Sequence, residues 1–163
     1  MDTINAHFDL SKDEYDTDNK SLAYLLKTKT GYLNLTILLL RCTIGIILFV
    51  VGSGKVFGWF GGFGLETTLK FYTQMGIAYP FAYMSIYTEF IGGLLLTIGF
   101  LTRPALIAVI INMLVATIIM FPNGFLGPNG SSYPFMFLVI AVAIFLAGPM
   151  SFSIDALLLR KMK

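Results

Sequence analysis

The chain has 163 residues, of which 56% are hydrophobic and only 12% are charged. A soluble domain carries about twice this charged fraction. Because the apolar residues stand in long runs, the composition predicts one integral membrane domain and excludes disordered, collagen-like and disulfide-rich classes. The formal net charge of +2 is too small and too scattered to indicate a nucleic-acid partner.

Ligands for metals and haem are scarce in this sequence. The chain has one histidine, His7, in the polar N-terminal region, and one cysteine, Cys42, inside an apolar run. These counts exclude a disulfide, a CxxC redox pair, a haem held between two intramembrane histidines and a His-rich zinc or copper site. We therefore predict no metal site, no intrinsic cofactor and no catalytic residues. Whether the chain is an enzyme stays open, and catalysis by this chain alone is disfavoured.

Residues 1–30 differ from the rest because they are rich in charged side chains, with acidic and basic residues interleaved. No apolar stretch opens the chain, so no cleavable signal peptide is predicted. A short interfacial helix is expected to begin near Ser21 and to reach Leu26. A solvated cytoplasmic tail is favoured over a docking segment, and residues 31–163 form the membrane domain.

Four apolar runs predict membrane-spanning helices, because about 20 residues at 1.5 Å per residue cross a ~30 Å hydrocarbon core. Their continuous apolar character favours helices over a barrel. The expected fold is therefore an all-α integral membrane four-helix bundle. The predicted spans are residues 32–51, 81–100, 104–121 and 133–148.

Basic residues near the span ends set the orientation. Seven of them fall on the side of the termini and two on the opposite side, which predicts cytoplasmic N- and C-termini in a cell (inner) membrane. The seven are Lys20, Lys27, Lys29, Arg103, Arg160, Lys161 and Lys163; the two are Lys55 and Lys70.

The connection between the first two spans, Gly52 to Pro80, is rich in glycine and aromatic residues. We expect an irregular external loop at its start, because so many glycines disfavour a helix. A short amphipathic helix is then predicted over Leu65 to Met75. This helix is interpreted as a lid across the outer mouth of the bundle.

Three polar residues are expected at one depth in the bundle: Arg41, Glu89 and Asn112. Intramembrane charges are costly, so we predict that Arg41 and Glu89 form an ion pair. Such a pair either fixes helix register, the slightly favoured interpretation, or forms a ligand site for a quinone head group or another small amphiphile. Lys55 either joins this cluster or, by preference, extends to the membrane interface.

Arg103 and Asp155 both fall at the predicted cytoplasmic boundary. A structural pair that closes this end of the bundle is favoured over a catalytic role.

Three segments of the sequence resemble the DoxX family of small four-span membrane proteins. The first runs from Arg41 to Gly64, the second from Glu89 to Arg103 and the third from Gly148 to Leu157. The likeness is carried by the glycines within these segments and by Arg41, Lys55, Glu89, Thr102, Arg103 and Asp155. It extends over about Leu35 to Leu158. The resemblance implies the four-helix membrane fold.

The resemblance implies several functions, because the family includes subunits linked to quinol oxidases and thiosulfate:quinone oxidoreductases, stress proteins, and trafficking or assembly factors. The first hypothesis is a membrane subunit of a quinone-linked oxidoreductase assembly that anchors a partner and shapes a quinone or lipid pocket. The alternative is an assembly, trafficking or small-molecule permeation protein without a redox role. Expected partners are membrane lipids and either other proteins or a second copy of this chain.

This sequence departs from the family pattern at three positions on the expected outer side. Val51, Met120 and Ser132 stand where many relatives have ionisable residues. The resemblance therefore does not carry metal or proton-coupled redox chemistry over to the outer mouth.

Overall fold

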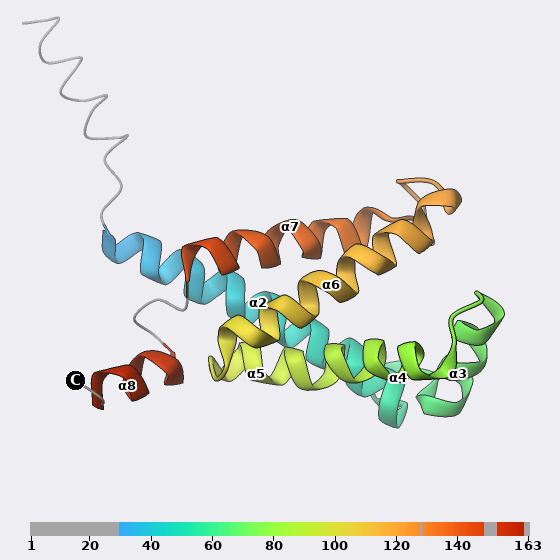
Figure 1. Ribbon diagram of the computed structural model, residues 1–163, viewed down its shortest axis with the longest axis horizontal. Coiled ribbons are helices and arrows are strands. Elements are labelled where there is room, and N and C mark those ends of the chain that lie inside the picture. Colours follow the sequence, from blue (N-terminus) through green and yellow to red (C-terminus); the bar gives the residue numbers. More distant parts are fainter. Residues whose placement is uncertain (1–29, 128, 149–152, 162–163) are drawn as a thin grey trace, which may run out of the picture. The chain divides into compact units, whose positions relative to one another are not determined.

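The computed structural model describes residues 30–127, 129–148 and 153–161, and every regular element in these ranges is helical. The predicted N-terminal tail and its interfacial helix lie outside these residues. The chain divides into two compact units, Met1–Leu33 and Asn34–Lys163, and the description below concerns the second. Its elements are α2 (Thr30–Phe57), η1 (Trp59–Gly61), α3 (Gly64–Gln74), α4 (Tyr79–Tyr87), η2 (Thr88–Gly92), α5 (Gly93–Ile98), α6 (Thr102–Met120), η3 (Phe121–Asn123), α7 (Ser132–Ala147) and α8 (Ile154–Lys161) (Figure 1).

Three helical stretches are long and apolar enough to cross a membrane: Tyr32–Phe57, Tyr79–Ile98 and Thr102–Asn123. The apolar helix Ser132–Ala147 is shorter and rises about 24 Å. Large apolar side chains on these helices are exposed, and Ile118, for example, is 64% exposed. A surface this apolar is not stable in water but is covered by lipid in a bilayer.

One hydrophobic core joins side chains from four of the apolar helices. α6 and α7 pack along each other, and α2 and α5 complete the cluster (Figure 1). The buried members are Ile44, Leu48, Leu96, Ala105, Leu106, Val109, Met113, Phe137, Ala141 and Ile144.

Glycines bring α2 against the second apolar stretch at backbone contact distance. A Cβ atom on Gly52 would overlap the backbone of Phe90, and one on Gly93 would overlap the backbone of Phe49. A Cβ on Gly45 would lie 2.6 Å from the hydroxyl oxygen of Thr97. Small residues permit such close approach of helices in membranes, and these contacts fix the register between the two segments.

The first apolar helix does not end at Val51, because α2 continues to Phe57. Gly52 and Gly54 were expected to break the helix, but both are buried and helical. Gly52 packs on the backbone of Phe90, and Gly54 packs on Gly62. Tertiary packing here outweighs the low helix propensity of glycine.

The second apolar stretch is not one uniform α-helix. The π-helical turn η2 separates α4 from α5, and Glu89 lies within this turn. The wider π turn re-aims the side chains around it, and such turns often occur at functional sites.

The expected short amphipathic helix is present as α3. Its buried residues include Leu69, which packs with Ala82 and Ile86 of α4 in a second, smaller apolar cluster. Val56, near the end of α2, also packs against this cluster. α3 therefore rests on α4 and on the last turn of α2.

Candidate functional site

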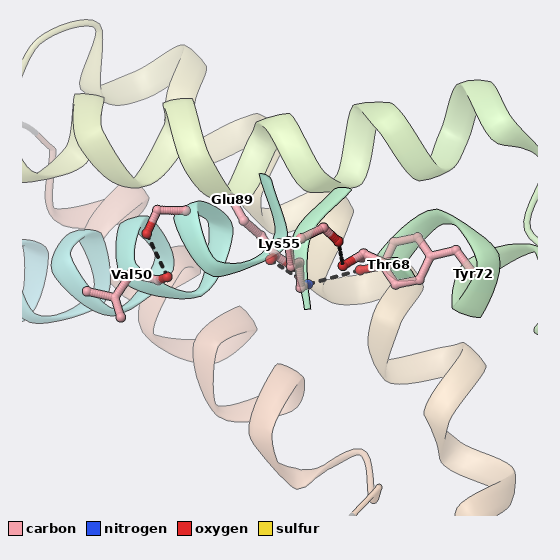
Figure 2. Close-up of polar contacts among 7 residues, drawn as sticks. Val50, Lys55, Thr68, Tyr72 and Glu89 are labelled. Atoms are coloured by element: carbon pink, nitrogen blue, oxygen red, sulfur yellow. Dashed lines mark hydrogen bonds and ion pairs between the residues drawn. The ribbon is translucent and has the colours of Figure 1, made fainter. Parts of the chain in front are cut away.

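The main polar site consists of Lys55, Tyr72 and Glu89, which we call the Lys55 cluster. The Lys55 ammonium lies 2.5 Å from Oε2 of Glu89 and donates a hydrogen bond of 3.0 Å to the hydroxyl oxygen of Tyr72. Figure 2 shows Lys55 placed between the other two side chains. The three residues come from α2, α3 and η2, so the cluster joins three elements.

Packing explains why these side chains meet. Lys55 lies one helical turn beyond Gly52, whose backbone contacts Glu89 and Phe90, so both charges reach the same level. Tyr72 lies on the face of α3 that packs on Val56 and α4, which turns its hydroxyl towards α2.

The cluster is largely removed from solvent. The side chain of Glu89 is 8% exposed and that of Lys55 is 24% exposed. Isolated charges at such depth are costly, and the cost falls when an opposite charge and further hydrogen bonds compensate them. Lys55 has both, because Glu89 supplies the opposite charge and the Tyr72 hydroxyl accepts a hydrogen bond. Its ammonium also lies 5.5 Å from the ring centroid of Tyr72.

Two further polar residues belong to the same level. Gly92 contacts Val109, and α6 runs antiparallel to the second stretch, so Asn112 lies near the level of Glu89. The Nδ2 atom of Asn112 is buried without a hydrogen-bond partner. The side chain of Tyr133, in the first turn of α7, lies within electrostatic range of both Lys55 and Glu89.

The predicted Arg41–Glu89 ion pair is wrong. The guanidinium of Arg41, which is 3% exposed, lies against Gly99, where a Cβ atom would be 2.8 Å from Nη1. Gly99 and Glu89 are separated by about 15 Å of helical rise. Lys55 takes the place at Glu89 that was expected for Arg41.

Asp155 forms a second polar site, which we call the Asp155 cap. Its carboxylate accepts hydrogen bonds from the backbone N–H groups of Leu101 (2.9 Å) and Thr102 (2.8 Å) at the start of α6. Its own N–H donates to the carbonyl oxygen of Gly99 at 3.1 Å. A carboxylate at a helix N-terminus satisfies free N–H groups and meets the positive end of the helix dipole.

Asp155 was predicted to form a structural pair with Arg103, but its carboxylate contacts the backbone N–H groups of Leu101 and Thr102 instead. Arg103 is exposed, and no ion pair joins it to Asp155 in the described part of the chain. Burial raises the pKa of the Asp155 carboxyl, but hydrogen bonds from Thr102 and Leu101 and the nearby charge of Arg41 outweigh burial, so this pKa lies below its ordinary value.

An open groove of about 280 Å³ adjoins the Lys55 cluster. Lys55 borders it on one side, and the glycine- and aromatic-rich segment after α2 forms the other side. The lining residues are Val50, Val51, Gly54, Lys55, Trp59, Phe60, Gly61, Gly62 and Phe63.

Among the residues that the structure describes, no three His, Cys, Asp or Glu side chains gather as a metal site requires. The available polar chemistry is that of an ammonium, a carboxylate, a phenol and an amide. These groups donate to and accept from a small polar head group.

Tyr72 is the member of the site that sequence reasoning missed. It shares a helical face with Leu65 and Leu69, and that pattern indicated burial for its ring. What the pattern lacked was the position of α3 over the end of α2, which only the three-dimensional packing provides.

The long apolar helices and their exposed apolar surface define a helical membrane protein. A family model named DoxX matches residues 36–122, which is more than half of the chain. The chain therefore belongs to the DoxX family. A search among curated proteins and a search among solved structures each found no match.

Proposed function

We propose that this DoxX-family chain is a four-span subunit of a quinone-linked oxidoreductase assembly in the cell (inner) membrane, with both termini cytoplasmic. In this proposal α7 is the fourth span of a four-helix bundle, and the tail and loops contact partner proteins. The chain anchors its partner and offers a site for a quinone head group or a lipid. Electron carriers belong to the partner.

The observation that carries the proposal is the buried ion pair between Lys55 and Glu89. Glu89 lies in a π-helical turn and Lys55 lines a groove, and these two positions favour a binding role over a purely structural one. A quinone supplies carbonyl oxygens. The Lys55 ammonium has one N–H beyond those directed at Glu89 and Tyr72, and this N–H suits such an oxygen.

Each residue of the cluster has a distinct part in this proposal. Lys55 donates a hydrogen bond to the ligand oxygen, and Glu89 keeps Lys55 in place and balances its charge. Tyr72 orients the ammonium from the opposite side. The aromatic residues along the groove exclude water from the ligand ring.

The alternative is an assembly, trafficking or small-molecule permeation protein without a redox role. It draws on the same ion pair, because a buried Lys–Glu pair by itself can hold helix register. The difference between the two proposals lies in what copurifies with the chain.

The test is purification of the full chain from its native membranes, with mass spectrometry of bound proteins and extraction of bound quinone. Wild type and Lys70→Met, which alters an exposed lysine of α3, are expected to retain quinone and respiratory subunits. Lys55→Met is expected to lose quinone while keeping its subunits. Precursor proteins as partners, with no quinone in wild type, would instead support the alternative.

A further inference from the structure

The groove beside Lys55 has a rigid wall. After α2, the backbone of Gly62 packs on Gly54 so closely that a Cβ atom on Gly62 would overlap the carbonyl of Gly54. Phe60 holds a left-handed backbone conformation with φ 54° and ψ 30°, which a non-glycine residue adopts only under constraint. The ring of Trp59 stacks on Phe57 with centroids 4.7 Å apart.

The shape and size of the groove suit a flat ring. Trp59, Phe60 and Phe63 supply aromatic surface, while Gly61 and Gly62 leave room along the backbone. Its volume of about 280 Å³ is near the lower end of small-molecule sites, roughly 300–1,000 Å³. One ring system fits, and an attached hydrocarbon tail would lie outside, in lipid.

The charge of the groove is balanced before any ligand arrives. Lys55 is the charged residue among those that line it, and its charge is paired with Glu89 at 2.5 Å. A neutral ligand gains a hydrogen bond to Lys55 without disturbing this pair. Glu89 does not line the groove, but its carboxylate lies 2.5 Å from the Lys55 ammonium. An anionic ligand that approaches this ammonium is therefore repelled by the nearby carboxylate, and the loss of its own hydration is not compensated.

We propose that this groove binds the ring of a neutral, planar amphiphile with an oxygen acceptor directed at Lys55, and that Glu89 makes the groove reject anions of the same shape. The ligand class rests on the proposed function, whereas the location and the charge selection rest on the groove and the ion pair. Glu89 is thus a specificity-determining residue that acts through Lys55.

The single tryptophan of the chain lines the groove and provides the readout. Saturable quenching of Trp59 fluorescence would be measured on the full chain in lipid nanodiscs, with free N-acetyltryptophanamide as the correction for light absorption. The probes are 2-methyl-1,4-naphthoquinone, which is neutral, and 2-hydroxy-1,4-naphthoquinone, which is anionic at neutral pH. The two probes share one ring system.

Wild type and the control Lys70→Met are expected to bind the neutral probe about tenfold more tightly than the anionic probe. This ratio corresponds to a difference of about 1.4 kcal/mol in binding free energy. Glu89→Gln is expected to reverse this preference, because the ammonium of Lys55 then lacks its counter-charge. Lys55→Met is expected to weaken binding of the neutral probe about tenfold, because the variant loses one hydrogen bond from a charged donor. An unchanged preference in Glu89→Gln would overturn the charge selection.

A second variant keeps the test decisive if Glu89→Gln does not fold. Val51→Phe fills the groove from α2 and leaves the ion pair in place, so it is expected to abolish saturable quenching by both probes. Quenching that persists in this variant would overturn the location. If Val51→Phe retains quinone in native membranes, the groove is not the quinone site, but the proposed function is still supported. If wild type binds the neutral probe but contains no quinone in native membranes, the proposed function is refuted, but the groove is still a binding site for such ligands.

Discussion

Lys55 is held by a carboxylate from one element and by a phenol from another, and each partner carries part of its stabilisation. The ion pair with Glu89 compensates two buried charges, while the hydrogen bond to Tyr72 fixes the direction of the ammonium. In a setting of low dielectric constant, removal of one partner leaves the other charge uncompensated.

The first prediction concerns this pair. Lys55→Met and Glu89→Gln are each expected to lower the free energy of unfolding by up to about 3–5 kcal/mol, because each leaves one buried charge. The double variant is expected to recover much of this loss. Chemical unfolding in detergent of all four proteins measures the coupling energy. Strictly additive losses would mean that the two residues do not interact.

The matched control is the exposed pair Glu66–Lys70 on α3, whose side chains are 84% and 67% exposed. Its hydrogen bond lowers the pKa of Glu66 and raises the pKa of Lys70. Solvent screens such a pair, so the same double-variant cycle is expected to give a coupling energy near zero.

The second prediction concerns Gly99, where two constraints coincide. Its φ is +70°, and a Cβ atom there would lie 2.8 Å from Nη1 of Arg41. Gly99→Ala is expected to cost more than the roughly 1–2 kcal/mol of left-handed strain, because Arg41 must also move. Gly76→Ala is the control, since Gly76 has φ +79° and nothing within 4 Å. If the two variants lose the same unfolding free energy relative to wild type, Arg41 moves away from the new methyl group without destabilising the fold.

At the scale of elements, the Asp155 cap ties the start of α6 to the start of α8. Gly99 ends α5 with hydrogen bonds from its own N–H and from that of Phe100 to the last turn, an arrangement typical of glycine-terminated helices. Asp155 then covers the N–H groups that begin α6. One carboxylate therefore closes the turn between two apolar helices.

The third prediction follows from the lowered pKa of Asp155. Because the folded pKa lies below the unfolded one, the stabilisation is fully present above the unfolded pKa, near about 3.9, and is lost as the pH falls through the folded value. Asp155→Ala is expected to cost about 0.5–2 kcal/mol at neutral pH, as loss of a helix cap does. This difference from wild type is expected to shrink below about pH 4. Thermal unfolding of both proteins between neutral and acidic pH measures this difference. A difference that does not change with pH would show that the ionised Asp155 carboxylate does not stabilise the start of α6.

The helices were predictable, but their register was not. Continuous apolar runs indicate spans because hydrocarbon tolerates few other structures. Depth counted from span ends placed Arg41 beside Glu89, on the assumption that neighbouring spans begin at one level. The packing of Gly45 on Thr97 and of Gly52 on Phe90 sets a different register. Such contacts depend on shape, so the sequence alone did not reveal Lys55 as the partner.

At the scale of the whole molecule, the segments that carry the family likeness gather at two sites. Lys55 and Glu89, from two segments, meet in the Lys55 cluster. Gly99, Thr102 and Asp155 meet in the Asp155 cap. The family match over residues 36–122 includes the first site entirely and only part of the second.

The fourth prediction concerns topology. A reporter fused after Lys163 is expected in the cytoplasm and one inserted near Gly127 on the outer side, because basic residues concentrate at the termini and the loop near Gly127 has no charged residue. Paired phosphatase and fluorescent-protein fusions measure both positions. An external signal from the C-terminal fusion would reverse the proposed orientation.

The long-range nature of the Asp155 cap has a consequence for biosynthesis. Asp155 is 53 residues from Thr102 along the chain, so a ribosome makes the start of α6 well before it makes the carboxylate that caps it. The turn between α5 and α6 stays without its cap until Asp155 has left the ribosome. Chains truncated before Ser153 are therefore expected to insert into the membrane but to remain targets for proteolytic quality control, which pulse–chase degradation would reveal.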